Sequence, residues 1–116
     1  MQRKNTDDVN VIIVAAGSST RFGGKTKKIF YKIAGIPVIV HSVRNFTSMF
    51  SQEDIIVVAG KDDIGKMENT LKKYSLGKVK ICEGGRERVD SVFRGLLTAD
   101  KRRVLIHDGA RPFVSK

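Results

Sequence analysis

The segment VNVIIVAAG (Val9–Gly17) carries the clearest structural signal in this sequence. A short run rich in β-branched side chains is followed directly by two alanines and a glycine. A continuous apolar run of this length is typical of a strand that is buried on both faces of a parallel sheet. The small residues after it predict a loop in which the backbone can approach a ligand closely.

Apolar runs and helical patterns alternate along the rest of the chain. Further strands are predicted at Ile55–Ala59, Val79–Cys82 and Val104–Ile106. Three apolar sets at helical spacing predict the buried faces of three helices: Ile39, Val43, Phe46 and Phe50; Ile64, Met67, Leu71 and Tyr74; and Val89, Val92, Phe93, Leu96 and Leu97. This order predicts an α/β fold, with a mostly parallel Rossmann-like sheet and helices on both of its faces.

The composition is that of a globular domain with an excess of positive charge. The chain has 116 residues, 41% of them hydrophobic, which suffices for one compact unit with a core. Its 22 basic and 12 acidic residues give a net charge of +10, and the span Val9–Gln52 holds no acidic residue. Such a span favours an anionic ligand, either a nucleotide triphosphate or a nucleic acid.

Several features predict a soluble, cytoplasmic protein that does not enter a membrane. No apolar run approaches the roughly 18 residues needed to cross a bilayer. The first ten residues are polar and mixed in charge, unlike a signal peptide. Cys82 is the single cysteine, so no internal disulfide forms, and no Cys/His spacing predicts a zinc site.

Three loops follow strands of the predicted sheet: Ala15–Lys28, Glu83–Arg88 and His107–Pro112. All three contain glycine and arginine. Ligands of open parallel sheets bind beyond the carboxyl ends of the strands, so we expect the three loops to lie together at one edge.

The first of these loops is predicted to bind phosphate, because its backbone N–H groups, Arg21 and its lysines can all contact phosphate oxygens. Two other interpretations stay open. The loop could be a plain flexible connection. Alternatively, Ser19–Thr26 could be the phosphate-binding loop GxxxxGK(S/T) of a P-loop NTPase, although Ser19 stands where that motif has glycine.

The second and third loops suggest a base-binding and a metal-binding element. Backbone amides after Glu83 and the hydroxyl of Ser91 could read the edge of a base, or the segment could be a plain turn beside an Asp90–Arg94 pair. Asp108 is placed to hold Mg²⁺, and Arg111 to orient it or to bind phosphate; the alternative is a structural pair of these two. His41 and His107 are interpreted as structural, because neither adjoins a nucleophile.

Four motifs occur in order along the chain. They are Ala15-Ala16-Gly17-x-x-x-Arg21-Phe22-Gly23 with Lys28, then Gly35-x-Pro37-Val38-x-x-His41-Ser42, then Gly84-Gly85-x-x-Arg88-x-x-Ser91-Val92-x-x-Gly95-Leu96, and then His107-Asp108-x-Ala110-Arg111-Pro112. In this order and spacing they resemble the 2-C-methyl-D-erythritol 4-phosphate cytidylyltransferases, from about Val9 to the last residue. Ribitol-5-phosphate cytidylyltransferases share most of these motifs.

The resemblance implies transfer of CMP from CTP to 2-C-methyl-D-erythritol 4-phosphate with release of pyrophosphate, in non-mevalonate isoprenoid biosynthesis. It implies Mg²⁺ as the cofactor, CTP and a small phosphorylated polyol as partners, no nucleic-acid or membrane partner, and a homodimer for full-length members. The implied roles are catalysis by Arg21 and Lys28, a metal ligand at Asp108, and nucleotide binding by Ala15, Ala16, Gly17, Gly84, Gly85, Arg88, Ser91, Ala110 and Arg111.

The chain departs from the family at two points. Lys27-Lys28-Ile29 replaces the usual Pro-Lys-Gln, so the second catalytic lysine could be Lys25, Lys27 or Lys28. Members of the family are also much longer, which implies that 1–116 is a single partial domain, the nucleotide-binding half. We therefore expect an open sheet edge, an uncovered apolar face, marginal stability or association, and impaired turnover. A non-catalytic CTP-binding module is the other possibility that stays open.

Overall fold

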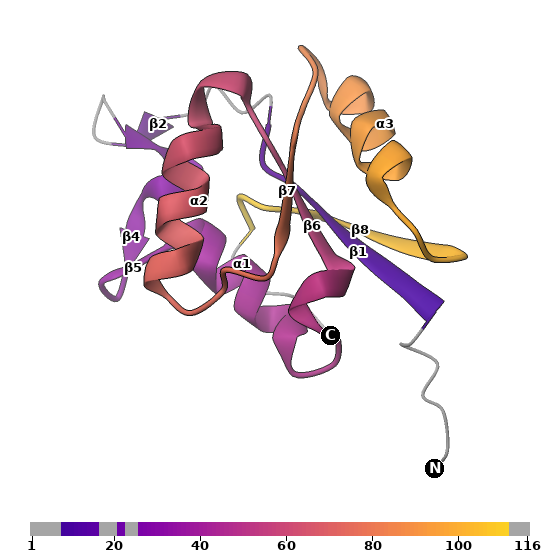
Figure 1. Ribbon diagram of the computed structural model, residues 1–116. Coiled ribbons are helices and arrows are strands. Elements are labelled where there is room, and N and C mark those ends of the chain that lie inside the picture. The colour runs from indigo at the N-terminus through magenta and orange to yellow at the C-terminus, as the bar shows by residue number, and fades with distance from the viewer. Residues whose placement is uncertain (1–7, 17–20, 23–25, 112–116) are drawn as a thin grey trace.

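The computed structural model describes residues 8–16, 21–22 and 26–111. Four parallel strands form the central sheet in the order β7-β6-β1-β8, as Figure 1 shows. Their bounds are β1 Val9–Val14, β6 Ile55–Ala59, β7 Lys80–Glu83 and β8 Arg103–Asp108. The strand order and direction confirm the predicted Rossmann-like α/β fold, and each predicted strand agrees with an observed one to within two residues.

Helices cover the sheet on both faces. α1 (Val38–Thr47) and α2 (Ile64–Lys73) pack on one face, and α3 (Arg88–Thr98) packs on the other (Figure 1). Alternation along β1 explains this arrangement: Val11 and Ile13 point toward α1 and α2, whereas Ile12 and Val14 point toward α3. Because every one of these positions is apolar, the strand can be buried on both sides.

Shorter elements lie between β1 and α1. β2 (Arg21–Phe22) pairs antiparallel with β3 (Thr26–Lys27), and β4 (Lys32–Ile33) pairs antiparallel with β5 (Ile36–Pro37). Three-residue 3₁₀ helices span Lys28–Phe30, Gln52–Asp54 and Lys61–Asp63. The turn between β4 and β5 places Ala34 at φ 55° and Gly35 at φ 77°, the left-handed pair that suits a tight hairpin.

A buried asparagine in β1 links the segments that precede β6 and β8. Asn10 lies inside β1 and is fully buried. Its side-chain oxygen accepts the backbone N–H groups of Asp100 and Lys101 at 2.9 and 2.8 Å, and its amide donates to the Asp54 carbonyl at 3.2 Å. A buried amide with three partners carries no unsatisfied-polar penalty, which explains a polar residue inside an apolar strand.

Of the predicted buried face of α3, Val92 does pack against the sheet, but the prediction is wrong for the other residues. Val89, Phe93 and Leu97 are 71%, 60% and 68% exposed, and the helix instead turns Ser91 and Gly95 toward the sheet. A Cβ atom on Gly95 would lie 2.6 Å from Cγ2 of Ile12, so the helix axis lies too close to the sheet for a larger residue there. Ser91, Gly95 and the partly buried Val92 thus form the contact, and Val89, Phe93 and Leu97 face outward.

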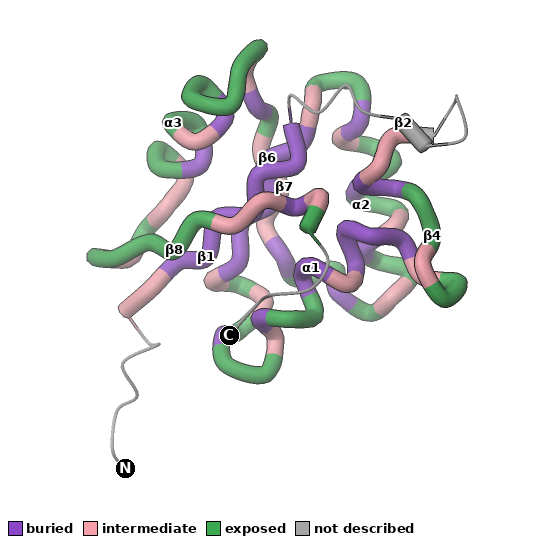
Figure 2. The backbone as a smooth tube through the Cα atoms, turned by 180° about the vertical axis from the view of Figure 1, so that it is seen from behind, coloured by how far each residue is buried: buried purple, intermediate pink, exposed green. Residues whose placement is uncertain are grey.

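The exposed apolar surface continues onto the edge of the sheet. Val104, Leu105 and Ile106 of β8 are each more than a third exposed, and Figure 2 shows the exposed colour along both α3 and β8. β8 pairs with β1 on one side and forms one edge of the four-stranded sheet. The open edge and the uncovered apolar face expected from the sequence are therefore both present among the described residues.

Candidate functional site

The register of the sheet brings the three predicted loops to one edge. Val14 of β1 pairs with Val58 of β6 and with Asp108 of β8, and Val58 pairs with Cys82 of β7. Just beyond these positions the N–H groups of Ala15, Gly84 and Gly109 each donate to a neighbouring strand's carbonyl at 2.8 Å. The first residues after β1, β7 and β8 are thereby held in one row, as predicted.

The glycine loop after β7 packs tightly on its surroundings. A Cβ on Gly84 would lie 2.4 Å from Cβ of Ala16 and 2.6 Å from Oγ of Ser91. The first and second loops are therefore in direct contact, and this contact requires glycine at position 84. The predicted nucleotide-binding residues Ala16, Gly84 and Ser91 lie together.

Ser91 lies beneath this loop, facing away from the exposed side of α3. Its side chain is fully buried, and its hydroxyl accepts the N–H of Gly85 at 3.2 Å. The contact shows that Ser91 positions the Gly85 backbone; direct contact of its hydroxyl with a base stays a prediction.

The start of α3 is closed by a capping box. The Glu87 N–H donates to the Asp90 carboxylate at 3.3 Å, and the Glu87 side chain accepts from the Asp90 backbone in return. Asp90 therefore caps the helix, which differs from the surface pair with Arg94 that the sequence left open. Arg88, predicted to support the loop, is the exposed first residue of α3.

A hollow of about 450 Å³ lies beside the glycine loop. Both signs of charge line it, and its walls come from the ends of β6 and β7 and from α3: Lys61, Glu83, Gly84, Gly85, Arg86, Asp90, Phe93 and Arg94. Its size falls within the roughly 300–1,000 Å³ of small-ligand sites.

The turn after β8 is held in place by several side chains. The Asp108 carboxylate accepts the Ala110 N–H at 2.9 Å, and no ion pair with Arg111 occurs among the described contacts. The hydroxyl of buried Ser42 lies 2.8 Å from the Gly109 carbonyl and 3.1 Å from that of Arg111. These bonds fix the orientation of the Asp108 carboxylate. The structural Asp108–Arg111 pair that the sequence left open is not observed in the described part of the chain, where the carboxylate bonds to backbone.

Both histidines contact backbone carbonyl groups. His107 Nε2 donates to the Arg111 carbonyl at 2.9 Å, and His41 Nε2 donates to that of Ile33 at 2.8 Å. The His107 ring also meets the Phe46 ring edge-on at 5.1 Å between centroids. These contacts agree with the structural roles predicted for them.

An ion pair that the sequence did not reveal connects the first loop to the 3₁₀ helix that precedes α2. Lys27 Nζ lies 2.6 Å from Oδ2 of Asp63, and these side chains are 26% and 13% exposed. The backbone of Lys27 pairs with that of Arg21, so the ion pair anchors the hairpin that carries Arg21. Lys28 begins the next 3₁₀ helix. Gly17 and Lys25 lie outside the described residues.

The sequence contained one hint of this pair. Asp63 follows the second buried strand closely, and a carboxylate in that position lies near the ligand edge of the sheet. Nothing in the linear order indicated that its partner would be Lys27, because the two residues are 36 positions apart.

The described residues contain no group of three or more His, Cys, Asp or Glu side chains able to enclose a metal. Asp108 fits a different mode, since Mg²⁺ in nucleotide sites takes one or two protein carboxylates and completes its shell with phosphate oxygens and water. Burial is the largest influence on the pKa of the Cys82 thiol and raises it. This cysteine is therefore a poor nucleophile at neutral pH. Within the described part of the chain, no helix is both long and apolar enough to cross a membrane.

Residues 9–116 match the family model of 2-C-methyl-D-erythritol 4-phosphate cytidylyltransferase. The chain belongs to this family. The resemblance of the four motifs is thereby confirmed over nearly the whole chain.

Individual relatives agree with this membership. The chain is 45% identical over 106 residues to the 2-C-methyl-D-erythritol 4-phosphate cytidylyltransferase of Clostridium novyi, covering 89% of this chain and 46% of the relative. The solved 4-diphosphocytidyl-2C-methyl-D-erythritol synthase of Anaerococcus prevotii matches with TM-score 0.70 and 30% identity, over 92% of this chain and 45% of that one.

A bifunctional IspDF structure from Campylobacter jejuni matches with TM-score 0.75 and 32% identity, over 93% of this chain and 27% of that one. The chain thus spans about half the length of the single-function relatives it matches. The match to these relatives supports the predicted fold and family.

Proposed function

We propose that this chain supplies the nucleotide-binding half of a cytidylyltransferase, which transfers CMP from CTP to 2-C-methyl-D-erythritol 4-phosphate and releases pyrophosphate. The observation that carries the proposal is the alignment of Ala15, Gly84 and Gly109 in one row at the carboxyl edge of the sheet. In open parallel sheets this edge is where nucleotides bind.

The backbone around Gly84 and Gly85 is suited to the nucleoside. Gly84 packs against Ala16 and Ser91, and the N–H groups of Gly84 and Gly85 are already bonded to Ala59 and Ser91, so in this proposal the fixed backbone of the loop presents its remaining polar groups to the edge of cytosine. The Ser91 hydroxyl accepts a hydrogen bond from the Gly85 N–H and so fixes its position. In this proposal Ser91 acts as a positioning residue, while Arg88, Ala15, Gly17, Ala110 and Arg111 complete the nucleotide site.

Asp108 is the proposed ligand of Mg²⁺. Its carboxylate lies at the end of β8, in register with the end of β1, and backbone bonds fix its orientation. When bound, Mg²⁺ neutralises charge on the triphosphate and orients it.

Transfer at phosphorus needs positioning and charge neutralisation more than covalent chemistry by the protein. An oxygen of the acceptor's phosphate forms a bond to the α-phosphorus of CTP, and the bond to the bridging oxygen breaks as pyrophosphate leaves. Arg21 and Lys28 are proposed to neutralise the charge that develops there. Lys28 is proposed for this role because its spacing from Arg21 matches the family's motif, and Lys27 is paired with Asp63.

The test is the melting temperature of the chain with Mg-CTP, with Mg-ATP and Mg-GTP as controls. A ligand at 100 times its dissociation constant adds about 2.7 kcal/mol of stability, which is several degrees for a domain of this size. We expect a rise with CTP alone, and its loss in Asp108→Ala. Equal rises with all three nucleotides would contradict base recognition and favour a site that binds only phosphate.

A CTP-binding module without turnover is the second candidate, since the chain spans only 46% of the Clostridium novyi relative. Release of pyrophosphate from CTP and the methylerythritol phosphate separates the two. The same assay with ribitol 5-phosphate tests the choice of polyol, and sedimentation of the chain tests the proposed homodimer.

A further inference from the structure

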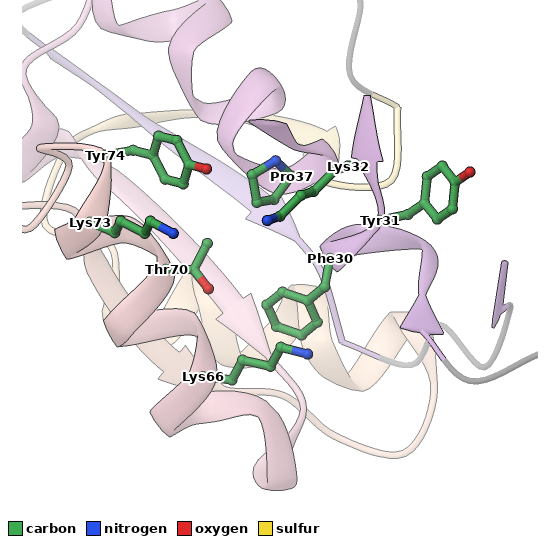
Figure 3. A pocket seen from close by; sticks show the side chains of 8 residues that line it. All are labelled: Phe30, Tyr31, Lys32, Pro37, Lys66, Thr70, Lys73 and Tyr74. Atoms are coloured by element: carbon green, nitrogen blue, oxygen red, sulfur yellow. The ribbon is translucent and has the colours of Figure 1, made fainter. Parts of the chain in front are cut away.

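A second hollow, of about 550 Å³, lies on the opposite face of the sheet from α3. It lies between α2 and the short hairpin formed by β4 and β5, and Figure 3 shows the side chains that line it. These residues are Phe30, Tyr31, Lys32, Pro37, Lys66, Thr70, Lys73 and Tyr74. None of them lines the hollow beside the glycine loop, so the two hollows are separate.

The charge of this hollow is of one sign. Lys32, Lys66 and Lys73 contribute three ammonium groups, and no acidic residue is part of the lining. Figure 3 shows the ammonium ends of Lys32 and Lys73 turned toward each other beside Pro37. Like charges gathered in a hollow repel one another, so an anion bound between them relieves that repulsion as well as pairing with each lysine.

Aromatic rings hold the lysines of α2 at the wall. Lys66 Nζ lies 4.5 Å from the centre of the Phe30 ring, and Lys73 Nζ lies 5.9 Å from that of Tyr74. Such contacts stabilise a cation while leaving its hydrogen-bond donors available. Thr70, between these two lysines on α2, adds a hydroxyl to the same wall.

The spacing of these groups indicates the shape of the anion. Lys66 and Lys73 are seven residues apart on one helix, which is about 10 Å along its axis. Their ammonium groups lie against different rings, that of Lys66 over Phe30 and that of Lys73 beside Tyr74, so a row of linked phosphates contacts both more readily than a single phosphate does. We propose that the hollow between α2 and the β4–β5 hairpin is a binding site for an oligophosphate group, carried by a nucleoside triphosphate or by inorganic oligophosphate.

The test is titration calorimetry of the chain with inorganic tripolyphosphate, in the absence of Mg²⁺. The pocket variant is Lys66→Gln with Lys73→Gln. The matched control is Lys72→Gln with Lys78→Gln, which removes the same charge from exposed positions that do not line the hollow. Charge-assisted bonds are worth about tenfold in affinity each, so we expect the pocket variant to bind at least tenfold more weakly while the control retains its affinity.

A parallel variant separates this proposal from the nucleotide site. Arg86→Gln with Arg94→Gln removes two positive charges from the hollow beside the glycine loop and should bind tripolyphosphate as the unaltered chain does, because neither residue lines the hollow beside α2. ATP without Mg²⁺ distinguishes the two carriers: tighter binding than tripolyphosphate assigns the site to a nucleotide, and equal binding assigns it to the phosphate chain alone.

Three results would overturn the proposal. One is the absence of binding by the unaltered chain. Another is an equal loss in the pocket variant and the control, which would mean attraction to the net positive charge only. The third is orthophosphate binding as tightly as tripolyphosphate, which would remove the argument from spacing.

Discussion

The two faces of the sheet are covered in different ways. Against α1 and α2, large apolar side chains interlock in an extensive buried cluster that includes Ile13, Ile39 and Met67. Against α3 the buried cluster is small, and the helix makes contact through Ser91, Gly95 and the partly buried Val92. One face is therefore a complete core, whereas the other is a close approach of backbones with apolar side chains left outside.

This difference shows the limit of helical periodicity as evidence. An apolar stripe reveals that a helix has two unlike sides, but not which side meets the sheet. In α3 the stripe of Val89, Phe93 and Leu97 faces away, and glycine forms the contact. An exposed stripe of this size is typical of a surface that another segment or molecule covers.

The largest effect should come from matched truncations on the two faces. Ile13→Ala removes a fully buried side chain from the complete core and should lower the free energy of unfolding by about 2–5 kcal/mol. Leu97→Ala removes one that is 68% exposed and should change it by less than about 0.5 kcal/mol. Urea denaturation measures both. Equal losses would mean that the α3 stripe is buried in solution and that the contrast between the faces is false.

Two helical glycines sharpen the comparison. Gly95→Ala should destabilise the chain by about 1–3 kcal/mol, because the new Cβ would lie 2.6 Å from Ile12. Gly65→Ala in α2 is the matched control, since nothing lies within 4 Å of its Cβ position. The control should gain up to about 1 kcal/mol from helix propensity. Thermal melts of the two variants should therefore move in opposite directions, and a rise for Gly95→Ala would disprove the close approach of α3.

The smallest effect concerns one ion pair near each face. The Lys27–Asp63 pair is largely buried, whereas Lys80 Nζ lies 3.5 Å from Asp100 with side chains 41% and 57% exposed. Double-mutant cycles with Lys→Met and Asp→Asn should give a coupling of about 1–2 kcal/mol for the first pair and less than about 0.5 kcal/mol for the second. A coupling near zero at Lys27–Asp63 would show that this ion pair does not anchor the first loop.

Much of the fold was predictable because its signals are local. Each central strand is a short apolar run, and α1 and α2 carry stripes that do face the core, so their order was sufficient for the sheet. β2 to β5 were not predicted, because strands of two residues are too short to show alternation. The hairpin turn at Ala34 was not predicted either, because alanine seldom adopts a left-handed conformation.

The candidate site divides in the same way. The glycine loop and Asp108 were recognised because they lie at the ends of predicted strands, and the sheet topology places both at its carboxyl edge. The roles of Ser42 and Asp63 depend on contacts across 67 and 36 residues, and no local pattern reports such contacts. Burial of Ser91 under Gly85 likewise required the position of α3 to be known.

The pairing of β1 with β8 has a consequence for the order of folding during synthesis. β1 is made first and lies inside the sheet, yet Val14 finds its partner Asp108 only near the end of the described chain. At about 5–20 residues per second, the ribosome leaves one edge of β1 unpaired for roughly 5–20 s. A nascent chain carrying an apolar strand with an open edge for that long is a natural client for a chaperone that binds extended segments.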